Sequence, residues 1–68
     1  MARDKAKDDR YFNCTETHEA DYVVGLYPHA KDEVRNFLAS ACKEKSLHNS
    51  THKDVYDLIK KELGYAQP

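Results

Sequence analysis

The chain lacks tryptophan and any long apolar run, and it has only two each of cysteine, proline and glycine. A length of 68 residues excludes a second domain and a large enclosed cleft. The absence of a long apolar run excludes a transmembrane helix. So short a chain also has little scaffold left to hold a catalytic constellation once its core is built. We therefore expect a protein that is not an enzyme.

An excess of charge of one sign is also lacking, because 11 basic and 12 acidic side chains give a formal charge of −1. The composition, 40% apolar and 34% charged, is typical of a globular domain and not of a disordered chain. Segment 13–33 is acidic, whereas segment 34–63 has six basic against four acidic side chains. This imbalance is much weaker than the basic stripe of a dedicated nucleic-acid-binding protein.

The two cysteines are Cys14 and Cys42. The first ten residues are charged and have no apolar stretch like that of a signal peptide, which predicts a cytoplasmic protein. In a reducing compartment we expect both thiols to be free and to serve as small buried apolar groups. A Cys14–Cys42 disulfide is the alternative, and it would require an oxidising compartment.

Residues 1–10 have no large apolar side chain apart from Met1, and their charges alternate. This pattern predicts a disordered, solvated tail followed by a single small domain over residues 11–68. Order is expected to begin at Tyr11 and Phe12, with Phe12 closing one end of the core.

The first element of the domain allows two interpretations. Thr15 or Thr17 could cap a helix whose apolar residues then recur at helical spacing through Tyr27, which favours an all-α, three-helix domain. However, segment 22–27 is rich in β-branched and aromatic residues and contains Gly25, which disfavours a helix. The alternative is an α+β fold, in which an N-terminal β-hairpin precedes two helices.

Two further helices are predicted over residues 31–45 and 52–63. Thr51 and Asp54 form a capping box before the last helix, and Gly64 stands where a helix commonly ends. Leu47, in the loop between these helices, is expected to turn inward. The predicted core comprises the apolar residues that share these helical faces: Val23, Val24, Tyr27, Val34, Phe37, Leu38, Ala41, Val55, Leu58, Ile59 and Leu63.

The order of these features resembles a family of short, uncharacterised bacterial proteins. The residues that carry the resemblance lie between positions 9 and 59: Asp9-Arg10, Asn13-Cys14-Thr15-Glu16, Glu19, Tyr22, Val34 with Phe37, and Asn49-Ser50 leading to Val55. The chain departs from that family in having no tryptophan in its first helix and a longer loop before its third. The resemblance implies a small helical fold and transfers no functional residues.

Five side chains could provide metal ligands: Cys14, His18, Cys42, His48 and His52. Two cysteines with two histidines would satisfy a tetrahedral zinc ion, but the spacing matches no standard zinc finger. Cys14 and His18 are also the only candidate nucleophile and base, and no oxyanion donor accompanies them. We therefore expect no metal, no other cofactor and no catalytic residues, with the zinc site as the alternative.

We expect the chain to bind a protein partner or a second copy of itself. If the apolar face of the first helix is buried, Tyr22 and Leu26 lie off that face beside Glu19 and Asp21, and aromatic residues are enriched at interfaces. The alternative is a small nucleic-acid-binding regulator that uses the basic second half: Lys43, Lys45, Lys53, Lys60 and Lys61. Neither a membrane nor a small-molecule substrate is indicated.

Overall fold

The computed structural model describes residues 3–68 as a short 3-10 turn followed by three α-helices. The turn η1 spans Lys5–Lys7, and the helices are α1 (Thr17–Gly25), α2 (Lys31–Lys43) and α3 (His52–Leu63). The predicted all-α class is confirmed, and so is the helical interpretation of the first element. The hairpin alternative is wrong, because the only β pairing within residues 3–68 is an isolated bridge between Tyr11 and Thr51.

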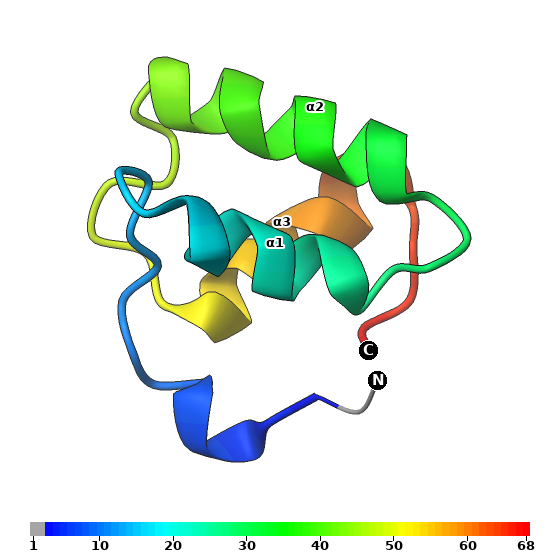
Figure 1. Ribbon diagram of the computed structural model, residues 1–68, viewed down its shortest axis with the longest axis horizontal. Helices are drawn as coiled ribbons and strands as arrows, with labels where there is room; N and C mark the ends of the chain where they lie inside the picture. The colour runs from blue at the N-terminus through cyan, green and yellow to red at the C-terminus, as the bar shows by residue number, and fades with distance from the viewer. Residues whose placement is uncertain (1–2) are drawn as a thin grey trace.

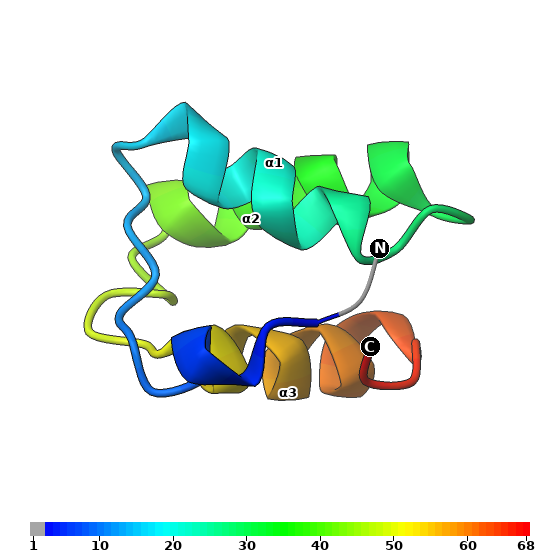
Figure 2. The same cartoon turned by 60° about the horizontal axis from the view of Figure 1, so that its bottom comes forward.

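The three helices form two layers. Figure 2 shows α1 and α2 side by side in one layer and α3 in the other, with the N-terminal segment running along α3. In Figure 1, α1 crosses the centre of the molecule between α2 and the chain termini. The core fills the space between the layers, so each helix buries one apolar face.

Local sequence explains where α3 begins and ends. Thr51 accepts a hydrogen bond from the Asp54 amide at 3.2 Å, and the Asp54 carboxylate accepts one from the Thr51 amide at 3.1 Å, which confirms the capping box. Gly64 ends the helix at φ 79°, a left-handed conformation that costs glycine little. Helix α2 begins at Lys31 as predicted but ends at Lys43, two residues earlier than expected.

The beginning of α1 differs from the prediction, because neither Thr15 nor Thr17 caps it. Glu16 occupies the N-cap position, and its side chain makes no capping hydrogen bond. The Thr15 amide and hydroxyl both donate instead to the Asn13 side chain, at 2.9 and 2.7 Å. Thr15 therefore takes part in a turn with Asn13 and does not cap the helix.

The core contains most of the predicted helical residues together with four others: Phe12, Leu26, Leu47 and Tyr56. Leu47 and Phe12 are both buried, as expected. Leu26 and Tyr56 are also buried, at 6% and 0% exposure, although the helical patterns left them outside the core. The buried apolar set is Phe12, Val23, Val24, Leu26, Tyr27, Val34, Leu38, Ala41, Leu47, Val55, Tyr56 and Ile59.

Three residues predicted for the core are only partly buried: Phe37, Leu58 and Leu63. Phe37 and Leu58 belong to α2 and α3, and both line one solvent-facing groove. Periodicity identifies the apolar side of a helix but not which edge of it is covered, because that depends on the position of the neighbouring helix.

The disordered tail over residues 1–10 stays a prediction, but the structure gives residues 3–10 specific contacts with the domain; residues 1 and 2 lie outside the described part. The carbonyl oxygens of Asp8 and Arg10 accept hydrogen bonds from the first two amides of α3, those of Lys53 and His52, at 3.2 and 2.9 Å. The Arg3 guanidinium lies 4.6 Å from the centroid of the Tyr56 ring. Contacts with an aromatic ring and with the free amides at the start of α3 therefore hold residues 3–10 against the domain. A prediction from composition does not consider such contacts.

A disulfide joins Cys14, just before α1, to Cys42 in the last turn of α2. The prediction of two free, buried thiols is therefore wrong, and Cys14 is exposed. The Cα atoms lie 5.8 Å apart although 28 positions separate the residues in sequence. The packing of α1 on α2 brings the two cysteines together, and the disulfide then stabilises this pair of helices.

Candidate functional site

The predicted partner-binding patch is largely occupied by contacts within the chain. Leu26 belongs to the core, so the prediction that it is exposed is wrong. The Tyr22 hydroxyl accepts a hydrogen bond from the Asp4 amide at 2.9 Å, and the Lys7 ammonium lies 4.2 Å from the centroid of the Tyr22 ring. Asp21 pairs with Arg35 at 2.8 Å. The N-terminal segment thus covers the aromatic surface that we had assigned to a partner.

Glu19, the fourth residue of that patch, faces His52, which is 1% exposed. The His52 Nε2 atom lies 3.2 Å from Glu19 Oε2, and Nδ1 lies 2.8 Å from the carbonyl oxygen of Arg10. The rings of Phe12 and Tyr22 meet the imidazole edge-on, at centroid distances of 5.7 and 6.1 Å. His52 therefore ties three segments together: the one before Phe12, α1 and α3.

Both polar partners of His52 are hydrogen-bond acceptors. A neutral imidazole has one N–H donor and one acceptor nitrogen, so the direction of each of the two hydrogen bonds depends on which ring nitrogen of His52 carries a proton. The shallow hollow beside the pair is lined by Lys7, Arg10, Tyr11 and His18, among others. Although His52 and Glu19 also line this hollow, the ring is only 1% exposed and both of its nitrogens contact the chain, so His52 links parts of the fold.

The alternative zinc site is contradicted by the disulfide. Cys14 and Cys42 are oxidised and supply no thiolate, which removes both sulfur ligands and the candidate nucleophile. His52 is engaged with Arg10 and Glu19, and His18 pairs with Glu16 at 2.9 Å. Over residues 3–68 no group of three or more His, Cys, Asp and Glu side chains has a geometry suited to a metal ion.

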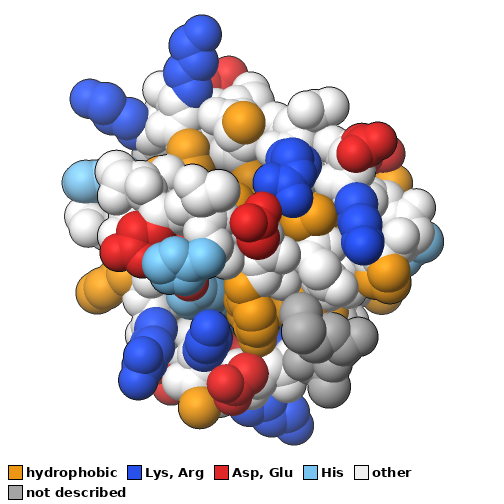
Figure 3. Space-filling model, in the orientation of Figure 1, with side chains coloured by type: hydrophobic (Ala, Val, Ile, Leu, Met, Phe, Trp, Pro, Cys, Tyr) orange, Lys and Arg blue, Asp and Glu red, His pale blue; other side chains and the backbone are white. Residues whose placement is uncertain are grey.

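The basic residues of the nucleic-acid alternative are all exposed: Lys43, Lys45, Lys53, Lys60 and Lys61. They lie at or next to the ends of α2 and α3, with Glu44, Asp54 and Asp57 between them in sequence and Glu62 directly after Lys61. On the face shown in Figure 3, blue lysine and arginine side chains stand apart from one another with acidic side chains among them. On this face the described residues form no continuous basic track of the kind that follows a phosphate backbone.

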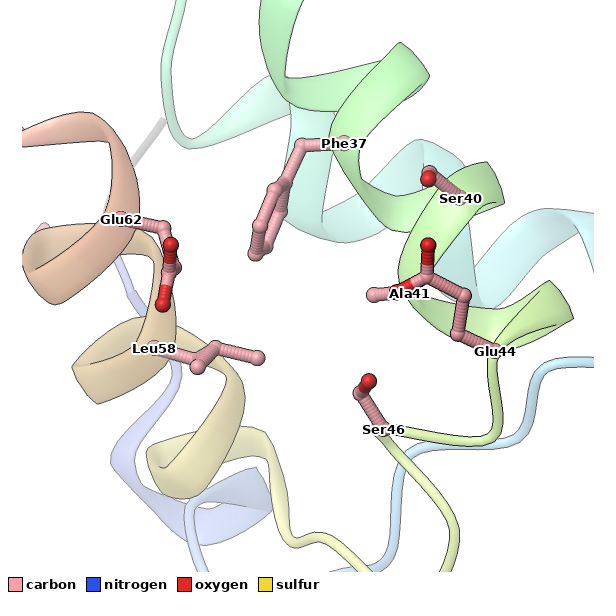
Figure 4. A pocket seen from close by; sticks show the side chains of 7 residues that line it. All are labelled: Phe37, Ser40, Ala41, Glu44, Ser46, Leu58 and Glu62. Carbon is pink, nitrogen blue, oxygen red and sulfur yellow. The ribbon is translucent and has the colours of Figure 1, made fainter.

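An open groove between α2 and α3 has the features of a binding site. It encloses about 200 Å³, and its floor contains the partly buried side chains of Phe37 and Leu58. Its lining residues come from α2, the following loop and α3: Phe37, Ser40, Ala41, Glu44, Ser46, Leu58 and Glu62. Figure 4 shows Phe37 and Leu58 projecting into the hollow and the carboxylates of Glu44 and Glu62 on opposite sides of it.

The polar groups of this groove are not engaged elsewhere in the described part of the chain. Within residues 3–68, the side chains of Glu44, Glu62, Ser40 and Ser46 form no hydrogen bond or ion pair. The groove also lies beside the last turn of α2, where the helix dipole places partial negative charge. An apolar floor, two carboxylates and two hydroxyls can together hold an amphipathic cation.

Sequence reasoning missed this site because it assigned Phe37 and Leu58 to the core. One signal in the sequence pointed to this site. The apolar stripe of α2 is broad and contains five residues: Val34, Phe37, Leu38, Ala41 and Cys42. A three-helix domain of this size can leave one edge of so wide a stripe uncovered. Which edge stays open, and that Glu44 and Glu62 flank it, depends on how α3 crosses α2.

Two tyrosine hydroxyls are buried without a hydrogen-bond partner within residues 3–68, those of Tyr27 and Tyr56. Burial raises the pKa of Tyr27 to about 12 and also raises that of Tyr56. In contrast, the Tyr65 hydroxyl donates to the Glu33 carboxylate at 2.8 Å, and this bond raises the pKa of Tyr65. These shifts reflect packing and hydrogen bonding, and none of the three groups lines the α2–α3 groove.

Comparison with known proteins finds no match among protein-family models, curated proteins or solved structures. The resemblance to short bacterial proteins therefore stays a prediction. Over residues 3–68 the longest helix, α2, has 13 residues, and none of the helices is long and apolar enough to span a bilayer.

Proposed function

We propose that this chain is a non-catalytic protein-interaction module whose binding surface is the α2–α3 groove. The observation that supports the proposal most is the open hollow of about 200 Å³ between Phe37 and Leu58. A hollow of that kind leaves apolar area in contact with water, and the side chain of a partner protein would remove it. We therefore assign partner recognition to the residues of the groove and no longer to Tyr22 and Leu26.

Its size argues for a side chain and against a small-molecule substrate. Pockets for drug-sized molecules usually enclose about 300–1,000 Å³ and bury most of the ligand. The groove is smaller than this and open to solvent. The absence of catalysis is also part of the proposal. It is supported by the engagement of His52 in the fold and of Cys14 and Cys42 in a disulfide.

The cytoplasmic location stays a prediction from the sequence, and the disulfide argues for an oxidising compartment instead. Cytosolic thiols are kept reduced, so a persistent bond between Cys14 and Cys42 favours an oxidising compartment. Rapid alkylation of free thiols in intact cells, followed by mass spectrometry of the protein, distinguishes the two locations by the redox state of the pair.

The proposed function is tested by selecting binders from a random peptide library displayed on phage. Peptides should be enriched on the wild-type protein, and their synthetic versions should shift amide resonances at Phe37, Ala41 and Leu58 in a ¹H–¹⁵N spectrum. A Ser40→Trp variant fills the groove from an exposed helical position, and it should lose this binding while keeping its helical circular dichroism.

Three outcomes would overturn the proposal: no enriched peptide, binding that maps outside the groove, or binding that survives Ser40→Trp. The same spectrum recorded with short duplex DNA tests the alternative function, nucleic-acid binding. DNA-induced shifts at Lys43, Lys45, Lys53, Lys60 and Lys61 that vanish with added salt would replace the proposal with nucleic-acid binding. Sedimentation of the wild-type protein tests whether a second copy occupies the groove instead.

A further inference from the structure

We infer that the α2–α3 groove recognises an arginine side chain of the partner protein. The inference rests on the proposed function and specifies the chemistry of the bound residue. It depends on three properties of the groove: an apolar floor, two carboxylates on opposite sides that have no ion-pair partner within residues 3–68, and a helix C-terminus beside it.

The floor suits the hydrocarbon part of a long cationic side chain. Phe37 and Leu58 are partly buried and project into the hollow from α2 and α3 (Figure 4). Arginine and lysine both lay their methylene groups along apolar surface while the charged end stays near polar groups. The Phe37 ring adds a further attraction for a cation placed over its face.

The two carboxylates make a cation preferable to a neutral side chain. Glu44 follows the last residue of α2, and Glu62 lies in the last turn of α3. Neither has an ion-pair partner within residues 3–68, so a bound cation would not have to break an existing contact. The partial negative charge at the end of α2 acts in the same direction.

The number and arrangement of acceptors favour arginine over lysine. Glu44 and Glu62 approach the hollow from opposite sides, and the hydroxyls of Ser40 and Ser46 provide further acceptors. A planar guanidinium group has five N–H donors directed along different edges, whereas an ammonium group has three around one point. A site with four acceptors on different sides is therefore satisfied better by guanidinium.

Neighbouring lysines limit the range of this attraction but do not remove it. Lys43, Lys45 and Lys61 are exposed and adjoin Glu44 or Glu62 in sequence. They reduce the net negative potential that a distant cation would experience. Recognition should therefore depend on close contacts within the groove, and 0.5 M salt should weaken it only a few-fold.

The test compares three blocked peptides on the full-length, ¹⁵N-labelled protein: acetyl-Gly-Arg-Gly-amide and its citrulline and norleucine counterparts. Citrulline preserves the shape of arginine without its charge, and norleucine retains only the apolar stem. The arginine peptide should produce saturable amide shifts in Ser40–Ser46 and Leu58–Glu62. The citrulline peptide should bind at least about tenfold more weakly, because charge-assisted hydrogen bonds are replaced by neutral ones.

The double variant Glu44→Gln, Glu62→Gln should lower the affinity for the arginine peptide to that for citrulline. Asp9→Asn makes one of the same charge changes at an exposed position outside the groove, and it should leave the preference intact. Because both changes to glutamine are at exposed positions, the fold is expected to survive, which circular dichroism checks.

Equal affinity of the arginine and citrulline peptides at the groove would overturn this inference and leave the proposed function standing. A preference for arginine that persists in the Glu44→Gln, Glu62→Gln variant would also overturn it. If none of the three peptides, nor any phage-selected peptide, shifts the groove resonances, then both the inference and the proposed function are wrong.

Discussion

His52 of α3 and Glu19 of α1 share a hydrogen bond of 3.2 Å between Nε2 and Oε2 across the two layers of the fold. His52 is 1% exposed, and its other ring nitrogen is 2.8 Å from the Arg10 carbonyl oxygen. One buried side chain therefore connects the two layers and the N-terminal segment. Removal of Glu19 leaves Nε2 of the buried imidazole without a hydrogen-bond partner, and removal of His52 leaves the partly buried Glu19 carboxylate without one, and both losses destabilise so small a core.

Accordingly, His52→Ala should lower the free energy of unfolding by about 3 kcal/mol, because it creates a cavity and removes both hydrogen bonds. Glu19→Ala should cost about 1 kcal/mol. Urea unfolding of both single variants and the double variant should give a coupling energy of about 1 kcal/mol. His18→Ala, at a side chain 78% exposed, is the control and should change stability by less than about 0.5 kcal/mol. A coupling energy near zero would show that the pair contributes nothing.

The disulfide should account for much of the stability of this small domain. Reduction of the Cys14–Cys42 bond, or a Cys14→Ser, Cys42→Ser double variant, should lower the free energy of unfolding by about 3 kcal/mol. The physical reason is that the unfolded chain gains the conformations that a closed loop forbids. Urea titrations with and without reductant measure the difference. Two thiols that react freely in the native, unreduced protein would show instead that the bond does not form.

The buried tyrosines predict how the protein responds to alkaline pH. Burial raises the pKa of Tyr27 to about 12, above its value of about 10 in an unfolded chain. The neutral phenol is thus favoured in the folded state. Its contribution to stability is complete below pH 10 and is lost as the pH rises through about 12. Absorbance at 295 nm should show one group of tyrosines that ionises only as circular dichroism reports unfolding.

Tyr27→Phe provides the matched variant for that experiment. It removes a buried hydroxyl that has no hydrogen-bond partner within residues 3–68, and it keeps the ring. At neutral pH the free energy of unfolding should rise by about 1 kcal/mol, and alkaline unfolding should shift to higher pH. A loss of stability at neutral pH would indicate that the hydroxyl has a partner.

Acidic pH should release the N-terminal segment before the domain unfolds. Arg3 donates to both carboxylate oxygens of Asp8, at 3.0 and 2.8 Å, and this hydrogen bonding lowers the pKa of Asp8 below its usual 3.8. The contribution of the pair is therefore present above pH 4 and is lost as the pH falls through the lowered pKa. Amide resonances of residues 3–10 should change in that range while α2 stays intact.

Asp8→Asn should produce the same released state at pH 7, because the amide no longer pairs with the guanidinium. Asp9→Asn is the control, since Asp9 is exposed and forms no hydrogen bond or ion pair with Arg3. Resonances of residues 3–10 that are unchanged in Asp8→Asn would mean that backbone hydrogen bonds to α3 suffice to hold the segment.

The sequence alone determined the helices α2 and α3, and it favoured the all-α class without excluding an N-terminal hairpin. An apolar period near 3.6 residues, the capping box of Thr51 and Asp54, and the left-handed Gly64 are local features, and local interactions decide them. The sequence favoured a helix over residues 17–25 less clearly, because the β-branched residues of this segment favour a strand. Its burial against α2 overrides that preference.

Only the tertiary structure decided which edge of each helix is covered, and with it the candidate site. Leu26 and Tyr56 are buried while Phe37 and Leu58 line a groove, since these outcomes depend on where the helices cross. The pairing of Cys14 with Cys42, and of Arg3 and Lys7 with tyrosine rings, joins residues that are distant in sequence. Periodicity describes one helix at a time, whereas a site between helices is a property of their relative positions.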